Sequence, residues 1–565
     1  MSLSSSIQLA NNTLRAMQIG LQVVGQNIAN ANTPGYLREE VILSPQQTQR
    51  QGSLLLGLGV SVQAVVQKVD NFLEQRLRKA NSDRAGSEAE QQSLEQLEGL
   101  IGELGDTDLS TSLGNFLSSI SEVLNQPESV SVRNLAVLKG RTLAQDINRL
   151  ANRVNQLRSD LNNRTVGLAD NVNRLIEQVR DLNVRIAQTE GGDASSSDAV
   201  GLRDQRNQAL SDLSKLIDIR VDEQASGAVN VYAGGDYLVF EVQMRQVEVQ
   251  QTTDRGLTIG QIQLADSHVP LQSSSGELGG LVRARDELLG GFVDRLDNLA
   301  ATLAFEFNKV YASGQGLVGY DRLTSQSGVG DAAAALNAAG LTFTPVNGSF
   351  DLQVYNKQTG LTETKTISVD LNGLGHDTTL TDLAGQLDAI DGVAASIDSQ
   401  NRLVLASESP DLQIAFGRDS SGVLAALGLN TFFTGSTATG LGINADVAAD
   451  PAKFAASRGG VGEDTANAVD LASFQDRPLG SSNQQTIFEL YSRITADTTQ
   501  AAAVARSVAD GYKVYQESLQ GQSLATSGVS IDEEAVKMIA LQRTFQASAK
   551  YIATLSELLD VLVKL

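Results

Sequence analysis

Side chains that could perform nucleophilic, acid–base or metal chemistry are scarce in this chain. It has two histidines, His268 and His376, far apart in the sequence, and no cysteine. A zinc site draws on histidine and cysteine ligands, and a Ser-His-Asp triad needs a histidine beside its serine. We therefore expect no zinc site, no thiol chemistry and no disulfide, and we interpret both histidines as ordinary surface or loop residues.

Two further patterns have the residue types of a reactive site but not its setting. Glu533 and Glu534 form a carboxylate pair, but they follow Ser530 in the order of a helix capping box, so we interpret them mainly as capping residues. Gly57-Leu58-Gly59 lacks the glycine spacing and the following lysine of a phosphate-binding loop. The sequence thus predicts no catalytic residue, no metal and no cofactor, and we do not expect an enzyme.

The composition argues against two classes of partner. The net charge is -23, whereas binding to nucleic-acid phosphates needs an excess of lysine and arginine. No apolar run reaches the roughly 18 residues of a transmembrane helix, so we expect no membrane partner. The N-terminus also lacks the basic and apolar regions of a secretory signal peptide, which leaves open export by a route that reads no such signal.

Both ends of the chain carry amphipathic patterns that favour packing against another helix. Apolar side chains recur at alternating steps of four and three residues, which is the spacing of a coiled-coil seam. The N-terminal stripe comprises Leu3, Ile7, Ala10, Leu14, Met17, Leu21, Val24 and Ile28. The C-terminal stripe comprises Met538, Leu541, Phe545, Ser548, Ile552, Leu555, Leu559 and Leu562. We expect the two ends to pack together although they lie at opposite extremes of the sequence.

A turn is expected after the first helix, which we predict over residues 1–30. The helix pattern ends at Asn30, and the pair Pro34-Gly35 follows it, directly before Tyr36. Proline disfavours the helical conformation of the residue before it, and Pro-Gly is a type II turn signal with glycine at positive φ. A loop-and-hairpin region should follow to about residue 66.

The predicted fold class is multidomain, because 565 residues exceed the size at which one core stops growing. A mainly α-helical core would combine the terminal helices, in a coiled-coil-like layer, with a long helical rod. The outer domains would be β-rich or α+β. The expected parts are a terminal assembly domain (1–66 and 520–565), a helical rod domain (67–218, 281–320 and 460–519), a β-containing domain (219–280) and an outer α+β insert (321–459).

Several motifs are specific enough to compare with known families. They are Asn27-Ile28-Ala29-Asn30-Ala31-Asn32-Thr33-Pro34-Gly35-Tyr36 near the N-terminus, Ser527 to Glu534 and Gln542 to Tyr551 near the C-terminus, and Leu202 to Asn207 and Gly276 to Leu281 between them. Together they resemble the bacterial flagellar axial proteins. All of them except the N-terminal motif look like the hook-associated members that join hook to filament. The resemblance covers about residues 1–320 and 460–565. Tyr311 departs from it, since the family usually has histidine there.

The resemblance implies a structural subunit of the flagellum that joins hook to filament and polymerises through its N- and C-terminal helices. It implies an extracellular location, reached through the flagellar type III export apparatus without a cleaved signal peptide. The implied partners are further copies of the chain in a ring-like or helical homo-oligomer, hook protein, hook-associated protein 3 and an export chaperone on the C-terminal helix. The expected assembly interface comprises Leu3, Ile7, Leu14, Met17, Leu21, Val24, Ile28, Asn30, Pro34, Gly35, Tyr36, Met538, Leu541, Phe545, Ile552, Leu555, Leu559 and Leu562.

The two stripes alone would make a marginal helix pair. Each offers about eight side chains, some small or polar, whose burial contributes roughly 10–15 kcal/mol. Ordering about 30 residues costs roughly 30–60 kcal/mol in backbone entropy, which hydrogen bonding offsets only in part. We therefore hypothesise that both ends stay disordered in the monomer and fold when a neighbouring subunit supplies a partner.

Three alternatives remain open at the level of sequence. The chain could be flagellar hook protein or another axial protein. The phenotype of its loss separates these alternatives, because losing a junction protein would leave hooks without filaments and release flagellin into the medium. It could instead be an extracellular binding protein or adhesin that acts through residues 321–459, which deletion of that insert would test. The third is a hydrolase carried in the same insert, for which an activity screen is the test.

Overall fold

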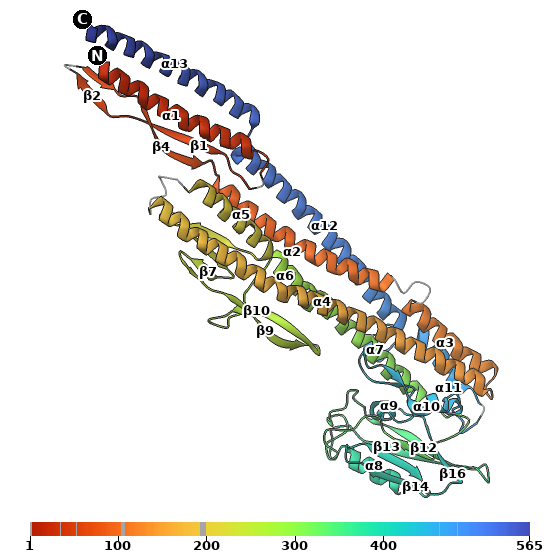
Figure 1. Cartoon of the computed structure of the whole chain (residues 1–565). Helices are drawn as coiled ribbons and strands as arrows, with labels where there is room; N and C mark the ends of the chain where they lie inside the picture. Colours follow the sequence, from red (N-terminus) through yellow and green to blue (C-terminus); the bar gives the residue numbers. More distant parts are fainter. Residues whose placement is uncertain are drawn as a thin grey trace. The chain divides into compact units, whose positions relative to one another are not determined.

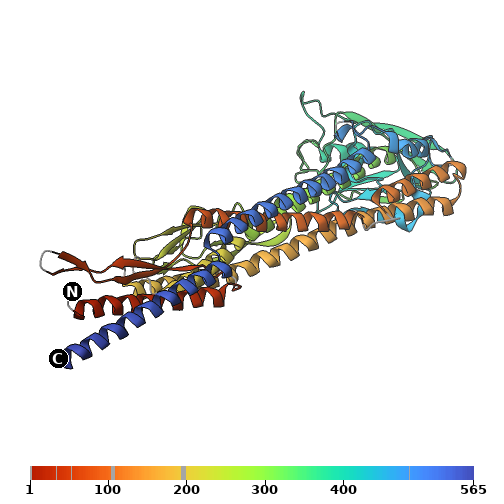
Figure 2. The same cartoon turned by 90° about the horizontal axis from the view of Figure 1, so that it is seen from above.

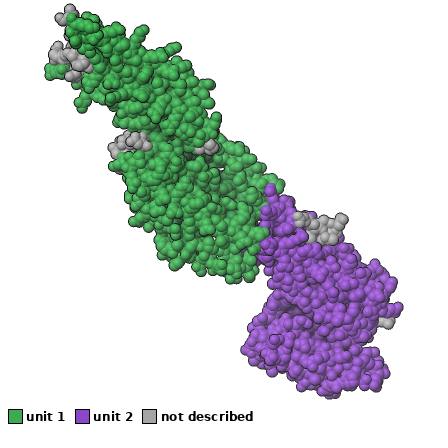
Figure 3. All heavy atoms as spheres, in the orientation of Figure 1, with its two compact units in different colours: residues 1–93, 159–287, 503–565 green, residues 94–158, 288–502 purple. Residues whose placement is uncertain are grey.

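A computed structural model describes residues 3–33, 35–51, 54–102, 108–191, 199–462, 464–482 and 484–564 of the chain. The chain divides into two compact units (Figure 3). Unit 1 comprises residues 1–93, 159–287 and 503–565, and unit 2 comprises residues 94–158 and 288–502. The predicted fold class is confirmed, because long helices form both ends and the rod, and the strands belong to small antiparallel sheets.

In unit 1, helix α1 (Leu3–Asn30) and helix α13 (Ile531–Lys564) lie side by side. The two chain ends are at the same end of this pair, so the helices run antiparallel (Figures 1 and 2). Strand β1 (Glu39–Pro45) pairs antiparallel with β4 (Val60–Gln67), and this ribbon also packs on α1. The ribbon ends in a hairpin of β2 (Thr48–Gln51) and β3 (Leu54–Gly57). α1 is therefore packed both on α13 and on the ribbon.

Both terminal segments are helical and packed within one chain, which differs from the hypothesis that they fold only on assembly. That hypothesis treated the ends as a lone pair of helices. In the structure the β1–β4 ribbon forms a further layer on α1, and buried polar contacts join α13 to the start of the ribbon. This additional burial contributes stability that the two stripes alone do not provide.

Five further helices and two small sheets belong to the described part of unit 1. The helices that lie wholly or partly in it are α2 (Asn71–Gly102), α4 (Val130–Glu190), α5 (Val200–Leu216), α6 (Gly276–Arg283) and α12 (Ile487–Ser527). Strands β5 (Arg220–Glu223), β6 (Val229–Ala233), β7 (Asp236–Phe240) and β8 (Gln243–Met244) form a meander, and β9 (Val247–Asp254) pairs with β10 (Leu257–Leu264). Within α4, a helix of 61 residues, the buried Thr165 donates its hydroxyl to the Leu161 carbonyl at 2.9 Å. A π-helical turn (Ala284–Leu289) follows α6.

Unit 2 has an aromatic core and an outer module. Helices α3 (Leu109–Asn125), α7 (Gly290–Tyr311) and α11 (Ala466–Ala472) pack around the rings of Phe116, Phe307, Tyr311, Phe432, Phe433, Phe454 and Phe474. The helices of the module are α8 (Leu380–Asp388), α9 (Val423–Leu427) and α10 (Ala445–Ala449), with 3₁₀ turns at Pro451–Lys453, Ser473–Asp476 and Gly480–Ser482 farther along the unit.

The strands of the outer module form three small antiparallel sheets. One sheet has the order β13 (Thr362–Val369), β12 (Gly348–Asn356), β16 (Leu412–Gly417). Another has the order β11 (Arg322–Thr324), β15 (Leu403–Ser407), β14 (Val393–Ile397), and β17 (Phe433–Thr434) pairs with β18 (Gly442–Ile443). Residues 320–455 thus have the α+β content that their sequence predicts.

Candidate assembly site

Helix α1 buries more than the single stripe that its heptad pattern marks. Of the predicted interface residues on this helix, Met17 and Val24 are buried, whereas Ile7, Leu14, Leu21, Ile28 and Asn30 are half-buried, and Leu3 begins the helix. Ala16, Gly20, Val23 and Asn27 form a further buried row. The extra row exists because α1 contacts both α13 and the β1–β4 ribbon.

Helix α13 uses its predicted stripe to face α1. Leu555 is buried, Met538, Leu541, Ile552 and Leu559 are half-buried, and Leu562 belongs to the last turns of the helix. Phe545 is 36% exposed, so this large side chain is only partly covered within one chain. Gly20 allows a close approach of the two helices, because a Cβ at this position would lie 3.3 Å from Leu541 Cδ1.

A groove of about 250 Å³ lies between α1, β1 and α13. Its apolar lining includes Met17, Val23, Val24, Val41, Leu43 and Leu541. Glu39, Glu534 and Lys537 also line it, so charged groups adjoin the apolar surface. The terminal pair therefore leaves a partly open apolar surface between its layers.

A second apolar surface lies on α13 away from α1. Val536, Ile539, Leu558 and Val561 are each more than half exposed. At 3.6 residues per turn, Val536, Ile539 and Val561 lie on the side of the helix away from the stripe that faces α1, and Leu558 lies at the edge of that stripe. We call these four residues the outer face of α13. Val536 and Ile539 lie near the start of the helix and Leu558 and Val561 near its end, and groups of exposed apolar side chains mark interaction surfaces in soluble proteins.

The turn after α1 has the geometry that its sequence predicts at the residues that are described. Gly35 has φ of +79°, and the Tyr36 N–H donates to the Thr33 carbonyl at 3.2 Å. Asn30 accepts the Thr33 hydroxyl on its side-chain oxygen at 3.3 Å. Pro34 lies outside the described residues. The turn directs the chain from the end of α1 towards the start of β1.

Asn27 is the centre of a buried polar cluster that joins α1 to the segment after the turn. Its side chain exchanges two hydrogen bonds with the backbone of Glu39, donating to the carbonyl at 2.9 Å and accepting the N–H at 3.0 Å. Its oxygen also accepts the Tyr36 hydroxyl at 2.9 Å. The Asn27 amide further donates to Glu534 Oε2 at 3.0 Å, which brings α13 into the cluster. Asn27 and Tyr36 of the N-terminal motif thus make specific contacts.

Arg38 and Glu534 form a buried ion pair that links the two ends of the chain. Arg38 donates through Nε and Nη2 to Glu534 Oε1 at 2.9 and 2.7 Å, and its Nη1 lies 2.9 Å from Glu533 Oε2. The Glu534 side chain is only 1% exposed. The interpretation of Glu534 as mainly a capping residue is therefore wrong, because its carboxylate is held by Arg38 and Asn27. Half of the capping box is present, since the Glu533 N–H donates to the Ser530 hydroxyl at 3.4 Å.

The electrostatics of this cluster keep Glu534 ionised. Burial acts to raise its pKa, but hydrogen bonds from Asn27 and Arg38 outweigh burial and hold the pKa below its ordinary value. Burial acts to lower the pKa of Arg38, and the two glutamates more than reverse that effect. For Tyr36, burial and the nearby acidic groups raise the pKa, so its hydroxyl remains a donor.

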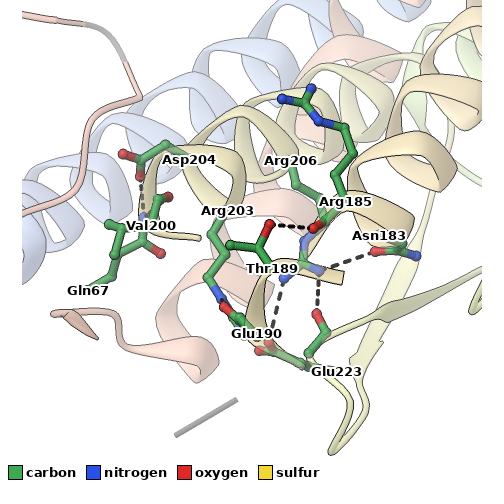
Figure 4. Close-up of polar contacts among 11 residues, drawn as sticks. Gln67, Asn183, Arg185, Thr189, Glu190, Val200, Arg203, Asp204, Arg206 and Glu223 are labelled. Carbon is green, nitrogen blue, oxygen red and sulfur yellow. Dashed lines mark hydrogen bonds and ion pairs between the residues drawn. The ribbon is translucent and has the colours of Figure 1, made fainter. Parts of the chain in front are cut away.

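A neighbouring polar network involves the predicted motif Leu202 to Asn207 on α5 (Figure 4). Gln67, at the end of β4, donates to Asp204 Oδ1 at 2.5 Å and to the Val200 carbonyl at 3.1 Å. Arg203 donates to both oxygens of Glu190 at 2.7 and 2.8 Å. Burial, together with the charge of Glu39, raises the pKa of Asp204 to about 7. This network ties the β1–β4 ribbon to the helices of unit 1.

The remaining candidate groups do not form a site. His268 Nδ1 lies 2.8 Å from Glu248, and His376 Nε2 lies 2.9 Å from Asp382, and both imidazoles are exposed. In the described part of the chain, no group of three or more histidine, aspartate or glutamate side chains is placed to hold a metal ion. No described helix combines the length and the apolar character needed to cross a bilayer.

Comparison with known families places most of the chain. Residues 94–323 match the model of the helical domain of flagellar hook-associated protein FlgK. Residues 7–36 match the model of flagella basal body rod protein, and residues 520–565 match that of the C-terminal part of flagellar basal body rod FlgEFG proteins. The two terminal matches cover most of α1 with its turn, and α13.

Individual relatives agree with these family matches. Flagellar hook-associated protein 1 of Escherichia coli is 24% identical over 588 aligned positions, covering 100% of both chains. The Bacillus subtilis protein of that name is 25% identical, covering 54% of this chain and 67% of the relative, and that of Salmonella typhimurium is 27% identical, covering 55% and 57%. The hook junction protein FlgK of Burkholderia pseudomallei has a solved structure with TM-score 0.49 and 14% identity, covering 79% of this chain and 99% of that one.

The chain is thus a structural protein of the bacterial flagellar axis, as its terminal motifs predict. Within that class it is similar over its full length to hook-associated protein 1, and the resemblance drawn from its sequence is confirmed.

Proposed function

We propose that this chain joins the flagellar hook to the filament and polymerises through α1 and α13. The observation that carries the proposal is the outer face of α13. This helix packs one stripe on α1 and leaves Val536, Ile539, Leu558 and Val561 exposed, so it has a second apolar surface for a neighbouring subunit. The full-length similarity to hook-associated protein 1 supports the location at the junction.

In this assembly, the predicted interface residues would divide into two sets. Met17, Val24 and Leu555, already buried, would hold the pair of helices together within a subunit. Half-buried and exposed residues such as Leu21, Ile28 and Phe545 would be covered further when subunits pack side by side. The groove between α1, β1 and α13 would receive apolar side chains of a neighbour in the same way.

We further propose that the chain is extracellular in the flagellum, exported by the flagellar type III apparatus without a cleaved signal peptide. Its neighbours would be other copies of itself, hook protein and hook-associated protein 3. An export chaperone would bind α13 before assembly. The exposed apolar outer face of α13 supports this last point, because such a surface favours aggregation until a partner covers it.

We propose no catalytic role. The two histidines, which would be the usual acid–base groups, are exposed, lie in different units and each contact a single carboxylate. The buried ion pair of Arg38 and Glu534 is held by contacts that explain it as a structural link between the chain ends.

Deletion of the gene in the source bacterium, followed by complementation, tests the proposal. We expect deleted cells to carry hooks without filaments and to release flagellin into the medium, and we expect the intact gene to restore filaments. Electron microscopy and immunoblotting of the medium provide the two readouts. Normal filaments on the deleted cells would overturn the proposal, and absence of hooks would favour hook protein or a rod protein instead.

A further inference from the structure

A polar cavity in unit 1 lies outside the terminal assembly site. It has a volume of about 440 Å³, is partly open to solvent, and is lined by the first turns of α2, one face of α5 and the strands β5 and β6. Its polar lining includes Glu74, Arg78, Arg206 and Glu223, and its apolar lining includes Leu210 and Val229. The size is that of cavities that hold small ligands or one or two side chains of a partner.

Arg206 is buried at this cavity with an incomplete set of acceptors. The residue is 2% exposed. Nη1 donates to the Gly227 carbonyl at 2.6 Å and to Asn183 at 3.2 Å, but Nη2 has Glu223 Oε1 at 3.5 Å, and Nε has no acceptor among the described residues (Figure 4). A buried guanidinium normally has its donors satisfied, because an unpaired buried donor costs about 1–3 kcal/mol.

Arg78 is a second arginine on the same cavity, and it lacks even a partial acceptor. It is half-buried, and among the described residues it makes no hydrogen bond or ion pair. Burial lowers its pKa, an effect that the charge of Glu74 opposes. Burial likewise lowers the pKa of Arg206, to about 10. Both arginines therefore line one cavity, Arg78 with donors unpaired among the described residues and Arg206 with an Nη2 that is only weakly paired.

The acidic groups around the cavity are already engaged. Glu223 accepts from Arg203, which is also held by both oxygens of Glu190. Glu74 accepts the Ser523 hydroxyl at 2.8 Å, and Asp222 accepts from Arg220 at 2.9 Å. Neither glutamate is within ion-pair distance of Arg78, and the arginine donors remain in excess.

We propose that this cavity binds one carboxylate group, carried by a ligand with a small apolar part. The carboxylate would accept from the guanidinium groups of Arg78 and Arg206, and the apolar part would lie against Leu210 and Val229. The carboxylate belongs either to a free organic acid or to an acidic side chain of another polypeptide. The proposal does not depend on the role at the hook–filament junction.

Charge favours a carboxylate over a phosphate. The cavity lining and its ion-pair partners carry four positive charges and four negative charges, on Arg78, Arg203, Arg206 and Arg220 and on Glu74, Glu190, Asp222 and Glu223. One carboxylate adds a single negative charge to this balanced set, whereas phosphate near neutral pH adds up to two. Repulsion from Glu74 and Glu223 therefore weighs more heavily against phosphate.

Ligand-observed NMR on the full chain, with titrations to obtain Kd, tests the proposal. The probes are 4-methylpentanoate, its neutral amide, inorganic phosphate, and the capped peptide acetyl-Leu-Glu-Leu-amide. We expect at least one carboxylate probe to bind 10-fold or more tightly than both the neutral amide and phosphate. Tighter binding of the peptide assigns the site to a polypeptide carboxylate, and tighter binding of the free acid assigns it to a small molecule.

Variants locate the binding. Arg78→Gln should weaken the better carboxylate probe at least 10-fold, and Arg78→Lys should restore part of the affinity. Arg76→Gln is the matched control, because Arg76 is on the same helix but donates to Tyr515 and does not line the cavity. The proposal is overturned if neither carboxylate binds, if phosphate or the amide binds as tightly, or if Arg78→Gln binds like the unaltered chain. Thermal unfolding of each variant confirms that it is folded.

Discussion

At the scale of single residues, the pair of Arg38 and Glu534 decides how the two chain ends meet. Both side chains are buried, and the guanidinium makes two hydrogen bonds to one carboxylate oxygen. Taking one partner away leaves an uncompensated buried charge, which is far more costly than losing an exposed pair. The cluster therefore adds a specific polar contact between α13 and the start of the ribbon to the apolar packing of the helices.

Glu534→Gln should loosen α13 without unfolding unit 2. We expect the free energy of local opening of α13 to fall by about 3 kcal/mol or more, because Arg38 loses its buried counter-charge. The difference in opening free energy between the two chains should be full at neutral pH. It should shrink only as the pH falls below the ordinary glutamate pKa of about 4.3, because the folded-state pKa of Glu534 is lowered and its protonation removes the contribution of the ion pair. Hydrogen–deuterium exchange of residues 531–564 measures the opening.

The matched control is Glu533→Gln on the same turn. The Glu533 side chain is 63% exposed, so its contact with Arg38 should contribute about 1 kcal/mol or less. Equal effects of the two substitutions would contradict the account of the buried pair.

The contribution of Asp204 to the stability of the fold should depend on pH in the opposite direction. Burial raises its folded-state pKa to about 7, against about 3.9 in an unfolded chain. The folded state then binds the extra proton between these values, so the contribution of Asp204 to stability falls as the pH rises from about 4 to 7. Asp204→Asn should be more stable than the unaltered chain at pH 8 and should show a shallower loss of Tm over that window.

Asp212→Asn is the control for this measurement. Asp212 lies on the same helix, and hydrogen bonds from Lys215 and Gln208 lower its pKa despite partial burial. Its replacement should therefore lower Tm at neutral pH. A rise in Tm for both variants would indicate a general effect of removing negative charge from a chain of net charge -23.

At the scale of elements, α13 has an inner stripe and an outer face with different roles. Leu555→Ala on the inner stripe should destabilise the packing of α13 on α1 by about 2–5 kcal/mol, because Leu555 is buried. Leu558→Ser on the outer face should leave the exchange of α13 nearly unchanged, since Leu558 is 53% exposed, but should reduce the number of filamented cells. Exchange and electron microscopy separate the two effects. Normal filaments with Leu558→Ser would argue against the outer face as an assembly surface.

The periodic parts of these elements could be predicted from the sequence, and the contacts between distant segments could not. The heptad spacing marks Met17, Val24 and Leu555, which are buried. It does not mark Ala16, Gly20 and Val23, because their burial also depends on the ribbon that covers α1. The contact of Arg38 with Glu534 joins residues 496 positions apart, and no local pattern records such a pairing.

The same limit applies to the motif residues. Gly35 has the positive φ that the turn signal requires, which short-range sterics determine. Tyr36 donates a hydrogen bond to Asn27, and Asn27 donates one to Glu534 on α13. These hydrogen bonds depend on the tertiary fold. The signal that could have identified Arg38 was its place beside the motif together with an acidic pair at the start of the last helix.

At the scale of the whole molecule, the outer module should be separable from assembly. Phe432 and Phe433 pack with Phe116 and Phe307, and Phe454 packs with Phe432, so a deletion must keep them. Replacement of residues 321–429 by a short glycine–serine linker satisfies this condition. We expect a folded chain that restores filaments and swimming in the deleted strain. A folded variant that restores neither would place an assembly contact in the module, and restored swimming with lost surface attachment would favour the adhesin alternative.

The most direct test of the central claim is site-specific photo-crosslinking at Leu558 in flagella isolated from complemented cells. We expect a crosslinked product whose mass is that of two copies of the chain, or of one copy plus hook protein or hook-associated protein 3. The same probe at Leu361, 71% exposed on the outer module, should give far less of it. If the Leu558 probe yields only the single chain in intact flagella, the outer face of α13 is not an interface, and polymerisation through the terminal helices is contradicted.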